Sequence, residues 1–332
     1  MRRMLATARA VLLLVVLPTV AISCDTTDSP MSPEAAPPAD TPVPTAAVSY
    51  SGIPYGPYDL WGNPTELQWG PGPFTSSLDN SSFPNSLAKR IAAARQKRIR
   101  LVLAMTAGPE AYITNGKFDL AKWKAKLSTL NTSEIRQAVA DGVADGTVVG
   151  NKLIDEPDSP QWGGVLTKSM IDGMAKYAKS MFPTLPMGIG HGASGFKWRS
   201  TERYQVLDWV SVQYVWNYNQ GNVNAWRDEV LSYARANGVA AMFGLNLLNG
   251  GVRDRTGGWD CPNTGGKGTR TSYCRMTADQ VQTYGRAIGP SGCALLMWRY
   301  DDAFMSKSAN VTAFKNVASL LNSQPRRSCK RP

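Results

Sequence analysis

Apolar, often β-branched runs alternate with amphipathic stretches along the chain from residue 51 onward. A short apolar run bounded by turn residues is typical of a buried strand, and apolar positions three to four residues apart are typical of a helix. The pattern predicts strands at 51–58, 100–106, 147–155, 186–191, 209–216, 239–246 and 294–300. It predicts helices at 84–97, 119–141, 167–181, 224–237, 277–288 and 309–322. Such alternation favours an α/β fold with a parallel sheet.

This prediction leaves the sheet one strand short of an eight-stranded barrel. Either an eighth strand lies within 61–83, or the helix predicted at 119–141 is broken at Asn131. Short polar side chains and glycines also mark helix boundaries, because they satisfy the free backbone groups at helix ends. The predicted starts are Ser86, Asp119, Thr167, Asn224 and Thr277, and the predicted stops are Gly238 and Gly289.

The connections between these elements differ in length according to their direction. Links from helix to strand are short, whereas links from strand to helix are long: 59–83, 107–118, 156–166 and 247–276. In a (β/α)8 TIM-type barrel the strand-to-helix loops form the binding face. An open doubly wound sheet would also bind ligands beyond its strand ends. The chain lacks a Gly-rich dinucleotide fingerprint and a phosphate loop, so a single (β/α)8 barrel is favoured.

The first residues have the features of an export signal. Arg2, Arg3 and Arg9 precede an apolar run at 10–20, which is too short and wrongly flanked for a membrane-spanning helix. The run leads into Ala21-Ile22-Ser23-Cys24, which resembles a bacterial lipobox with Ala21 in place of the usual Leu. This resemblance implies that Cys24 is lipidated and that the exported protein is membrane-anchored, facing the periplasm or the cell exterior. The alternative is an ordinary cleaved secretion signal.

The segment after Cys24 is unlike the rest of the chain. Residues 24–47 contain six prolines and four acidic residues but no aromatic residue. Such a segment cannot bury enough apolar surface to fold, and proline keeps it extended. We therefore divide the chain into a lipoprotein signal peptide at 1–23, a lipidated Cys with a disordered tether at 24–47, and a folded domain at 48–332.

Composition and charge limit the possible function. The 332 residues are 43% hydrophobic, and their 36 Lys and Arg against 25 Asp and Glu give a net charge of +11. Without the signal peptide the charge is +8, and residues 48–332 alone carry +12. This charge suits solubility and contact with anionic surfaces. No nucleic-acid-binding motif is present, and a single His excludes a multi-His metal centre, so we expect no nucleic-acid partner, metal or cofactor.

Four cysteines follow Cys24 in what we expect to be an oxidising compartment. Cys261 and Cys274 bracket a Gly/Thr/Asn-rich loop, and Cys293 and Cys329 flank the last predicted strand and helix. Four cysteines allow three connectivities. We expect the pairs Cys261–Cys274 and Cys293–Cys329, of which the second would join the two chain segments at the bottom of a barrel.

One strand end carries adjacent carboxylates, in Leu153-Ile154-Asp155-Glu156-Pro157. Strict alternation would place Glu156 on the same side as Lys152, facing the barrel, with Asp155 on the other side as a supporting neighbour. A carboxyl that is partly buried at the end of a barrel strand has a raised pKa, which suits a general acid. The alternative is a structural role as a helix cap or salt-bridge partner.

Polar and aromatic residues also gather at the other strand ends and in the long loops. Amides and carboxylates bind hydroxyl groups, and aromatic rings stack on the apolar faces of sugars, so this set predicts a carbohydrate cleft, although each residue alone is more often structural. The substrate-binding candidates are Tyr55, Tyr58, Trp61, Thr106, His191, Gln213, Tyr214, Trp216, Asn246, Trp259, Trp298 and Arg299.

The chain resembles the (β/α)8-barrel glycoside hydrolase superfamily, in particular an exported bacterial lipoprotein branch. The similarity covers about Tyr50 to Leu321 and rests on Tyr55-Gly56-Pro57-Tyr58, on the Asp155-Glu156-Pro157 strand end, and on Trp298-Arg299-Tyr300-Asp301. The strand end is similar to the Asn-Glu-Pro of the largest glycosidase clan, with Asp155 in place of Asn. The resemblance implies that Glu156 is the proton donor. The clan's second Glu has no counterpart in the strand at 241–247.

Glycoside hydrolysis usually needs a second carboxylate, for which we expect Asp301, then Asp302 or Asp155. Carboxyl groups roughly 6.5–9.5 Å apart invert the anomeric centre and groups roughly 5–5.5 Å apart retain it, and both outcomes stay open. We therefore expect a monomeric, surface-anchored glycoside hydrolase acting on a poly- or oligosaccharide. The alternatives are a non-catalytic glycan-binding barrel and another hydrolase or lyase chemistry. A second carboxylate near Glu156 would favour the enzyme.

Overall fold

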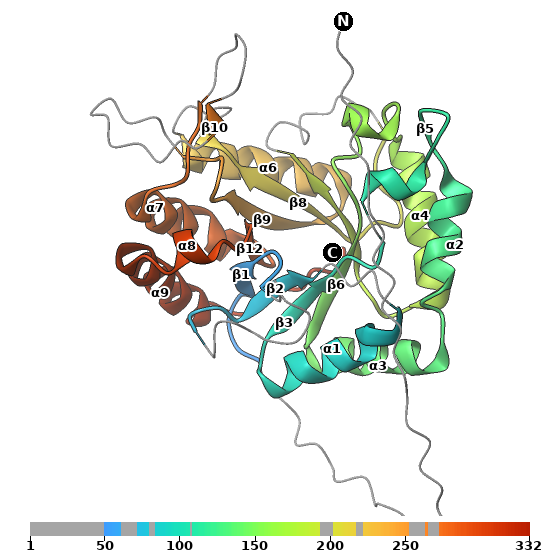
Figure 1. Ribbon diagram of the computed structural model, residues 1–332, viewed down its shortest axis with the longest axis horizontal. Coiled ribbons are helices and arrows are strands. Elements are labelled where there is room, and N and C mark those ends of the chain that lie inside the picture. The colour runs from blue at the N-terminus through green and yellow to red at the C-terminus, as the bar shows by residue number, and fades with distance from the viewer. Residues whose placement is uncertain are drawn as a thin grey trace, which may run out of the picture. The chain divides into compact units, whose positions relative to one another are not determined.

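Eight parallel strands surround a central axis, and helices cover the outside of the ring (Figure 1). The structure, a computed structural model, describes residues 50–60, 72–79, 84–106, 108–192, 202–216, 222–251, 263–264 and 272–332. These residues belong to the compact unit Ala46–Pro332. Cys24, Trp61, Trp259 and Cys261, as well as the predicted signal peptide and tether, lie outside the described residues.

The ring is formed by strands that pair in the order β1-β12-β9-β8-β7-β6-β3-β2. The strands are β1 (Tyr55–Pro57), β2 (Ser76–Asp79), β3 (Arg100–Leu103), β6 (Val148–Asp155), β7 (Met187–His191), β8 (Trp209–Tyr214), β9 (Ala240–Asn246) and β12 (Leu295–Trp298). Between the two ends of this order, Thr75 donates its N–H to the Tyr55 carbonyl at 2.8 Å, and Tyr58 forms a parallel bridge with Leu78. The fold is therefore the predicted (β/α)8 TIM-type barrel.

A glycine allows the strands to approach where β1 meets β2. A Cβ atom at Gly56 would lie 1.6 Å from the carbonyl oxygen of Ser76, which no side chain could tolerate. The absence of a side chain at Gly56 thus lets the two short strands come together and complete the ring.

The helices are α1 (Pro84–Gln96), α2 (Leu120–Ser128), α3 (Ser133–Asp145), α4 (Lys168–Met181), α6 (Val223–Asn237), α7 (Ala278–Ile288), α8 (Asp302–Met305) and α9 (Ser308–Asn322). Short 3-10 turns lie at Pro109–Tyr112, Pro160–Trp162 and Gly289–Ser291. Two hairpins extend from strand-to-helix loops: β4 (Ile113–Thr114) with β5 (Lys117–Phe118), and β10 (Asn263–Thr264) with β11 (Ser272–Tyr273).

Both ways of completing the barrel that the sequence left open occur. The eighth strand is β2, within 61–83, and the predicted helix at 119–141 is interrupted near Asn131 to give α2 and α3. The break is stable because Thr132 caps the second helix, accepting a hydrogen bond from the Ile135 N–H at 3.2 Å. The helix α3 ends later than expected, at Gly146, whose φ of 86° only glycine adopts readily.

Several of the predicted helix boundaries are confirmed. Asp119, Thr167 and Thr277 each accept a hydrogen bond from the first turn of their helix, and Thr277 and Gln280 form a capping box. The helix α6 is capped by Asn222 rather than by the expected Asn224, and it ends at Gly238 in the left-handed conformation.

Two apolar layers hold the barrel together. The larger layer lies between strands and helices, and a smaller one fills the barrel interior with side chains that include Leu78, Val102, Trp209, Met242 and Leu296. The indole of Trp209 fits only because neighbouring strands carry glycine, since a Cβ at Gly188 would lie 1.9 Å from its ring. Because the interior is filled by side chains, the barrel can hold a ligand only at its ends.

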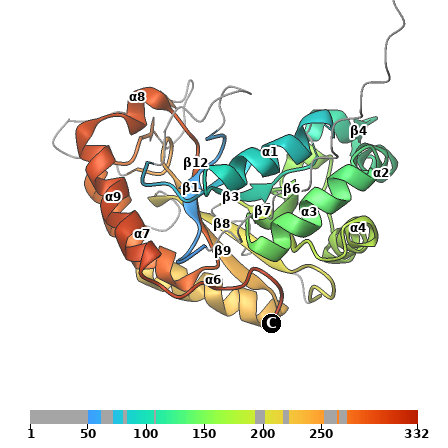
Figure 2. The same cartoon turned by 90° about the horizontal axis from the view of Figure 1, so that it is seen from below.

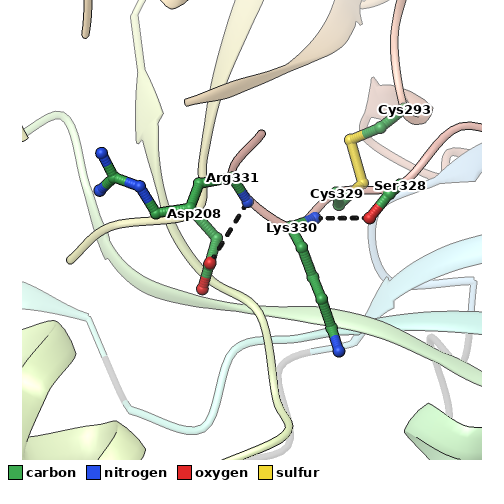
Figure 3. Close-up of a disulfide and its surroundings, with 6 residues drawn as sticks. All are labelled: Asp208, Cys293, Ser328, Cys329, Lys330 and Arg331. Atoms are coloured by element: carbon green, nitrogen blue, oxygen red, sulfur yellow. Dashed lines mark hydrogen bonds between the residues drawn. A yellow bond between two sulfur atoms is a disulfide. The ribbon is translucent and has the colours of Figure 1, made fainter. Parts of the chain in front are cut away.

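The predicted Cys293–Cys329 disulfide is present and lies at the end of the barrel where the strands begin (Figure 3). Cys293 directly precedes β12, and Cys329 follows α9, with a Cα–Cα distance of 5.3 Å. We call this end of the barrel the floor and the opposite end, where the strands finish, the top. In Figure 2 the C-terminus lies at the floor and α8 at the top. Cys274 is also disulfide-bonded, but Cys261 lies outside the described residues, so the Cys261–Cys274 pairing stays a prediction.

Candidate active site

A cavity of about 680 Å³ opens at the top of the barrel. Residues from the ends of β1, β3, β6, β8, β9 and β12 line it, so its walls come from strands that are far apart in the sequence. Eight of the predicted site residues meet there: Tyr58, Thr106, Asp155, Glu156, Gln213, Asn246, Trp298 and Arg299.

The carboxylate pair at the end of β6 sits on a tightly held turn. Glu156 has a φ of 44°, in the left-handed region that residues other than glycine seldom adopt. The indole N–H of Trp162 lies 2.8 Å from the Asp155 carbonyl and 3.1 Å from the Glu156 carbonyl, and the Glu156 N–H donates to the Gly190 carbonyl at 2.7 Å. These bonds hold the backbone in a sparsely populated conformation, which is common at functional sites.

Asp155 faces the barrel, which corrects the expectation that it lies on the opposite side from Lys152. The pairing of β6 with β7 shifts register between Lys152 and Ile154, so strict alternation is lost at this irregularity. As a result the Lys152 ammonium lies 3.3 Å from an Asp155 carboxylate oxygen. Asp155 also lies directly over Gly190, where a Cβ would come within 2.2 Å of its Oδ1.

Glu156 lines the cavity as well and remains exposed to solvent. Its carboxylate reaches over β7, because a Cβ at Gly192 would lie 2.6 Å from its Oε1. Partial burial raises the pKa of Glu156, the nearby Asp155 and Asp158 raise it further, and Lys152 opposes them. A raised pKa keeps more of a carboxyl group protonated at a given pH, which suits a proton donor at the cavity surface.

Lys152 supplies a buried positive charge below the two carboxyl groups. Lys152 projects from β6, and its ammonium lies 5.2 Å from the centre of the ring of Tyr58, which follows β1. Burial alone would lower the pKa of Lys152, but Asp155 and Tyr58 outweigh burial and the pKa is raised. Lys152 therefore stays protonated and keeps Asp155 paired.

Amide groups at the ends of β8 and β9 form a further wall of the cavity. The Asn246 amide nitrogen donates to the Gln213 side-chain oxygen at 3.3 Å, and the Asn249 N–H donates to the Asn246 side-chain oxygen at 3.0 Å. Gly244 makes room for Gln213, since a Cβ there would lie 2.9 Å from the Gln213 Cγ. At the end of β12, the Arg299 guanidinium lies 5.8 Å from the centre of the Trp298 ring. Amides, a guanidinium and aromatic rings together suit a ligand with many hydroxyl groups.

The structure adds lining residues that the sequence analysis missed, chiefly Asp59 and Gln161. Asp59 directly follows the Tyr55–Tyr58 motif, has a φ of 57° and donates its N–H to the Leu78 carbonyl at 3.0 Å. The sequence could have indicated Asp59 by its position, because it directly follows the predicted strand at 51–58. In the ring, β2 and β3 separate β1 from β6, so Asp59 and Glu156 come from different walls of the cavity.

Other predicted site residues face the helices instead of the cavity. Tyr55 packs against Phe74, with ring centres 5.7 Å apart, and Tyr214 packs between Trp226 and Tyr284. His191 is buried against Tyr233, and burial, with Lys168 nearby, lowers its pKa to about 4. Trp216 packs, partly buried, against the same outer apolar layer. Neighbours in a strand point to opposite sides, so where Tyr58 and Gln213 face inward, these residues face outward.

Asp301 does not line the cavity and has a structural role. Its carboxylate accepts the Phe304 N–H at 2.8 Å and caps α8. The expectation that Asp301 is the second carboxylate of the site is therefore not met, while Asp59 and Asp155 do lie at the cavity with Glu156.

Within the described part of the chain, no group of three or more His, Cys, Asp or Glu residues is arranged to hold a metal ion. No described helix is both long and apolar enough to cross a membrane.

The barrel is similar to solved glycoside hydrolases. A mutant of xylanase A from P fluorescens subsp. cellulosa, in complex with xylopentaose, superposes with a TM-score of 0.50 at 11% identity, covering 83% of this chain and 99% of that chain. Xylanase 10B from Thermotoga maritima gives 0.45 at 10% identity, with 83% and 99% covered. The GH113 β-mannanase AaManA from Alicyclobacillus acidocaldarius, in complex with ManMIm, gives 0.45 at 12% identity, with 84% and 99% covered.

At this level of identity the similarity shows the fold, a (β/α)8 barrel of the kind found in glycoside hydrolases. No protein-family model matches the sequence, and no curated protein matches it.

Proposed function

We propose that this protein is a glycoside hydrolase in which Glu156 is the proton donor. The observation that carries the proposal is the position of Glu156, which ends a barrel strand at a cavity that also contains Asp59 and Asp155. The raised pKa of Glu156 supports the role, because a general acid must be protonated when the substrate binds. The glycoside hydrolase fold of the structural neighbours supports carbohydrate as the substrate class.

In this mechanism the Glu156 proton passes to the oxygen of the scissile glycosidic bond as that oxygen leaves the anomeric carbon. Asp59 serves as the second carboxylate, since it comes from the end of β1, three strands around the ring from β6, whereas Asp155 directly precedes Glu156 on the same strand. Asp59 either removes a proton from an attacking water or bonds to the anomeric carbon until water replaces it. In the first route the proton taken up by Asp59 returns to Glu156 through solvent, and in the second Glu156 recovers its proton from the incoming water, so either route consumes one water.

Substrate contacts follow from the remaining lining residues. The amides of Gln213, Asn246 and Asn249 offer hydrogen bonds to sugar hydroxyls, and the rings of Tyr58 and Trp298 offer faces on which a sugar can stack. A cavity of about 680 Å³ is of the size that binds small ligands, which suits one or two sugar units of an oligosaccharide or polysaccharide chain.

The test begins with a screen of the protein on plant, fungal and bacterial polysaccharides for newly formed reducing ends. On a hydrolysed glycan, Glu156→Gln should lower turnover by about 10²–10⁴-fold and leave glycan binding nearly unchanged, because it removes the proton but keeps the size of the side chain. Glu134→Gln, an exposed position in the first turn of α3, is the matched control and should keep parental turnover. Near-parental turnover of Glu156→Gln would refute the assignment.

A glycan-binding barrel without catalysis is the second candidate, and two observations favour it. The strand β9 ends in Asn246 rather than Glu, and Asp301 is used to cap α8. Under this alternative the protein binds a glycan on an array, hydrolyses none, and binds it equally well after Glu156→Gln.

We also propose that the protein is exported and anchored to a membrane by a lipid on Cys24. The lipobox-like Ala21-Ile22-Ser23-Cys24 and the proline-rich segment behind it support this proposal. Cys24→Ser should release the protein from the membrane fraction into the soluble fraction. Retention of the variant in the membrane at the parental level, after a high-salt wash, would contradict lipid anchoring.

A further inference from the structure

Two basic depressions lie at the floor of the barrel, at the opposite end from the candidate active site. One has a volume of about 430 Å³ and is lined by Lys97, Arg98 and Lys315. The other has a volume of about 410 Å³ and is lined by Arg326, Arg327 and Lys330. No acidic residue is found among the described residues that line either depression. We call these six exposed side chains the basic floor.

Acidic residues beside the basic floor are already paired. Asp145, at the end of α3, forms an ion pair with Arg95. Asp208, which precedes β8, lies 2.7 Å from the Lys179 ammonium and also accepts the Arg331 N–H at 3.3 Å. The charges of the basic floor are therefore not neutralised by these neighbours, and they remain available to an external anion.

The disulfide holds half of the basic floor in place. Cys329 is bonded to Cys293, and the Lys330 N–H donates to the Ser328 hydroxyl at 3.0 Å. In Figure 3 the Lys330 side chain extends away from the disulfide, while the Arg331 N–H is bonded to Asp208. The C-terminal segment thus presents its basic side chains from a covalently fixed backbone.

The chain also enters the barrel at the floor. The Tyr50 hydroxyl lies 2.9 Å from the Thr147 hydroxyl, just before β6, and the Arg100 guanidinium lies 5.8 Å from the centre of the Tyr50 ring. The segment between Cys24 and Tyr50 would span at most about 80 Å as an extended proline-rich chain and about 30 Å as a flexible coil. A lipid on Cys24 would therefore limit the distance between the membrane surface and the floor to the reach of this segment.

We infer that the basic floor binds the anionic headgroups of the membrane that holds the anchor, so that the cavity at the top faces away from the membrane. This inference rests on the lipid anchor of the proposed function, which tethers the protein to the membrane. The positive charge that would bind the headgroups comes from the basic floor itself. Basic residues near an anionic bilayer strengthen its binding additively, and a tether raises their local concentration at the surface.

The binding test uses the full chain carrying Cys24→Ser, which has no lipid, and measures sedimentation with vesicles at low salt. The protein should bind vesicles that contain phosphatidylglycerol, and binding to pure phosphatidylcholine vesicles should be negligible. The double variant Arg327→Gln with Lys330→Gln should weaken binding at least about tenfold, because each basic residue near an anionic membrane surface contributes about 1 kcal/mol of binding free energy. The matched control, Lys117→Gln with Lys122→Gln, removes two exposed charges near the top and should change binding less than about twofold.

Equal losses in the two double variants would overturn the inference, because binding would then follow total charge and not the floor. The inference would also be overturned if the protein did not bind phosphatidylglycerol vesicles. It would be overturned as well if a soluble anionic polysaccharide at equal charge concentration displaced the protein from the vesicles, because the floor would then be a binding site for an anionic polymer. Because this assay lacks the lipid, its failure is distinct from a failure of Cys24→Ser to release the protein in cells.

Discussion

The two ends of the barrel differ in the kind of charge that they present. At the top, Asp59, Asp155 and Glu156 share a cavity with amides and aromatic rings, whereas the floor presents lysine and arginine without a lining carboxylate. A net charge of +11 for the whole chain therefore says little about the site. Six exposed bases line the two depressions at the end opposite the cavity, so net charge is informative only once it is placed on the fold.

The same strands explain why the ends differ. Each parallel strand contributes its first residue to the floor and its last to the top, so residues a few positions apart belong to different surfaces. The strand β6 starts beside Arg326 and Arg327 and finishes at Asp155. The proposed catalysis at the top and the proposed attachment at the floor should then be separable by mutation, and the following variants test that separation.

The largest expected effect at the top is that of Asp59→Asn. Asparagine tolerates the left-handed φ of 57° at this position, so the variant should fold. If Asp59 is the second carboxylate, turnover on a hydrolysed glycan should fall by about 10²–10⁴-fold. Asp141→Asn, on the exposed surface of α3, is the control. Parental turnover of Asp59→Asn would pass the role to Asp155.

At the floor, removal of the disulfide should cost stability without changing chemistry. Cys293→Ser with Cys329→Ser opens a loop whose ends are 36 residues apart, which costs about 4 kcal/mol in the chain-entropy account. Urea unfolding should show this loss, while turnover below the unfolding transition should stay at the parental level. A large loss of turnover in the folded variant would show that the two ends are coupled.

The fold could be predicted because hydrophobic periodicity and loop length can be read from each segment of the sequence on its own. The sequence pattern located seven strands, and the eighth, β2, was only one of two alternatives for completing the barrel, since Ser76-Ser77-Leu78-Asp79 is short and mostly polar. Such a strand is recognisable only through its neighbours, β1 and β3, between which it lies. Pairing, not local preference, makes these four residues extended.

The site was predicted less well, for a geometric reason. Most of the predicted strand ends line the cavity, but the side that each residue faces depends on register, and one irregularity between Lys152 and Ile154 turned Asp155 inward. At the ends of β7 and β8, His191 and Tyr214 are polar or aromatic residues like those that line the cavity, yet they pack against α6. Composition at a strand end does not carry that information.

A smaller effect at the top concerns the pH profile. Burial, Asp155 and Asp158 raise the pKa of Glu156, and Lys152 lowers it. Asp155→Asn removes a negative charge and leaves the Lys152 charge unpaired, so both changes lower the pKa of Glu156. Since a general acid loses activity as it deprotonates, the alkaline limb of kcat should move to lower pH. A limb that moves to higher pH, or does not move, would show that Glu156 is not the group that titrates there.

The smallest expected effect separates a helix cap from a catalytic group at Asp301. The carboxylate accepts the Phe304 N–H, so Asp301→Ala should destabilise the fold by about 1 kcal/mol, the usual cost of losing a cap. Asparagine caps helices about as well as aspartate, so Asp301→Asn should be nearly parental in stability. Both variants should keep turnover, measured well below the unfolding temperature. A catalytic carboxylate would give the opposite pattern, in which Asp301→Asn stays fully stable but loses turnover as completely as Asp301→Ala, and that result would restore Asp301 as partner of Glu156.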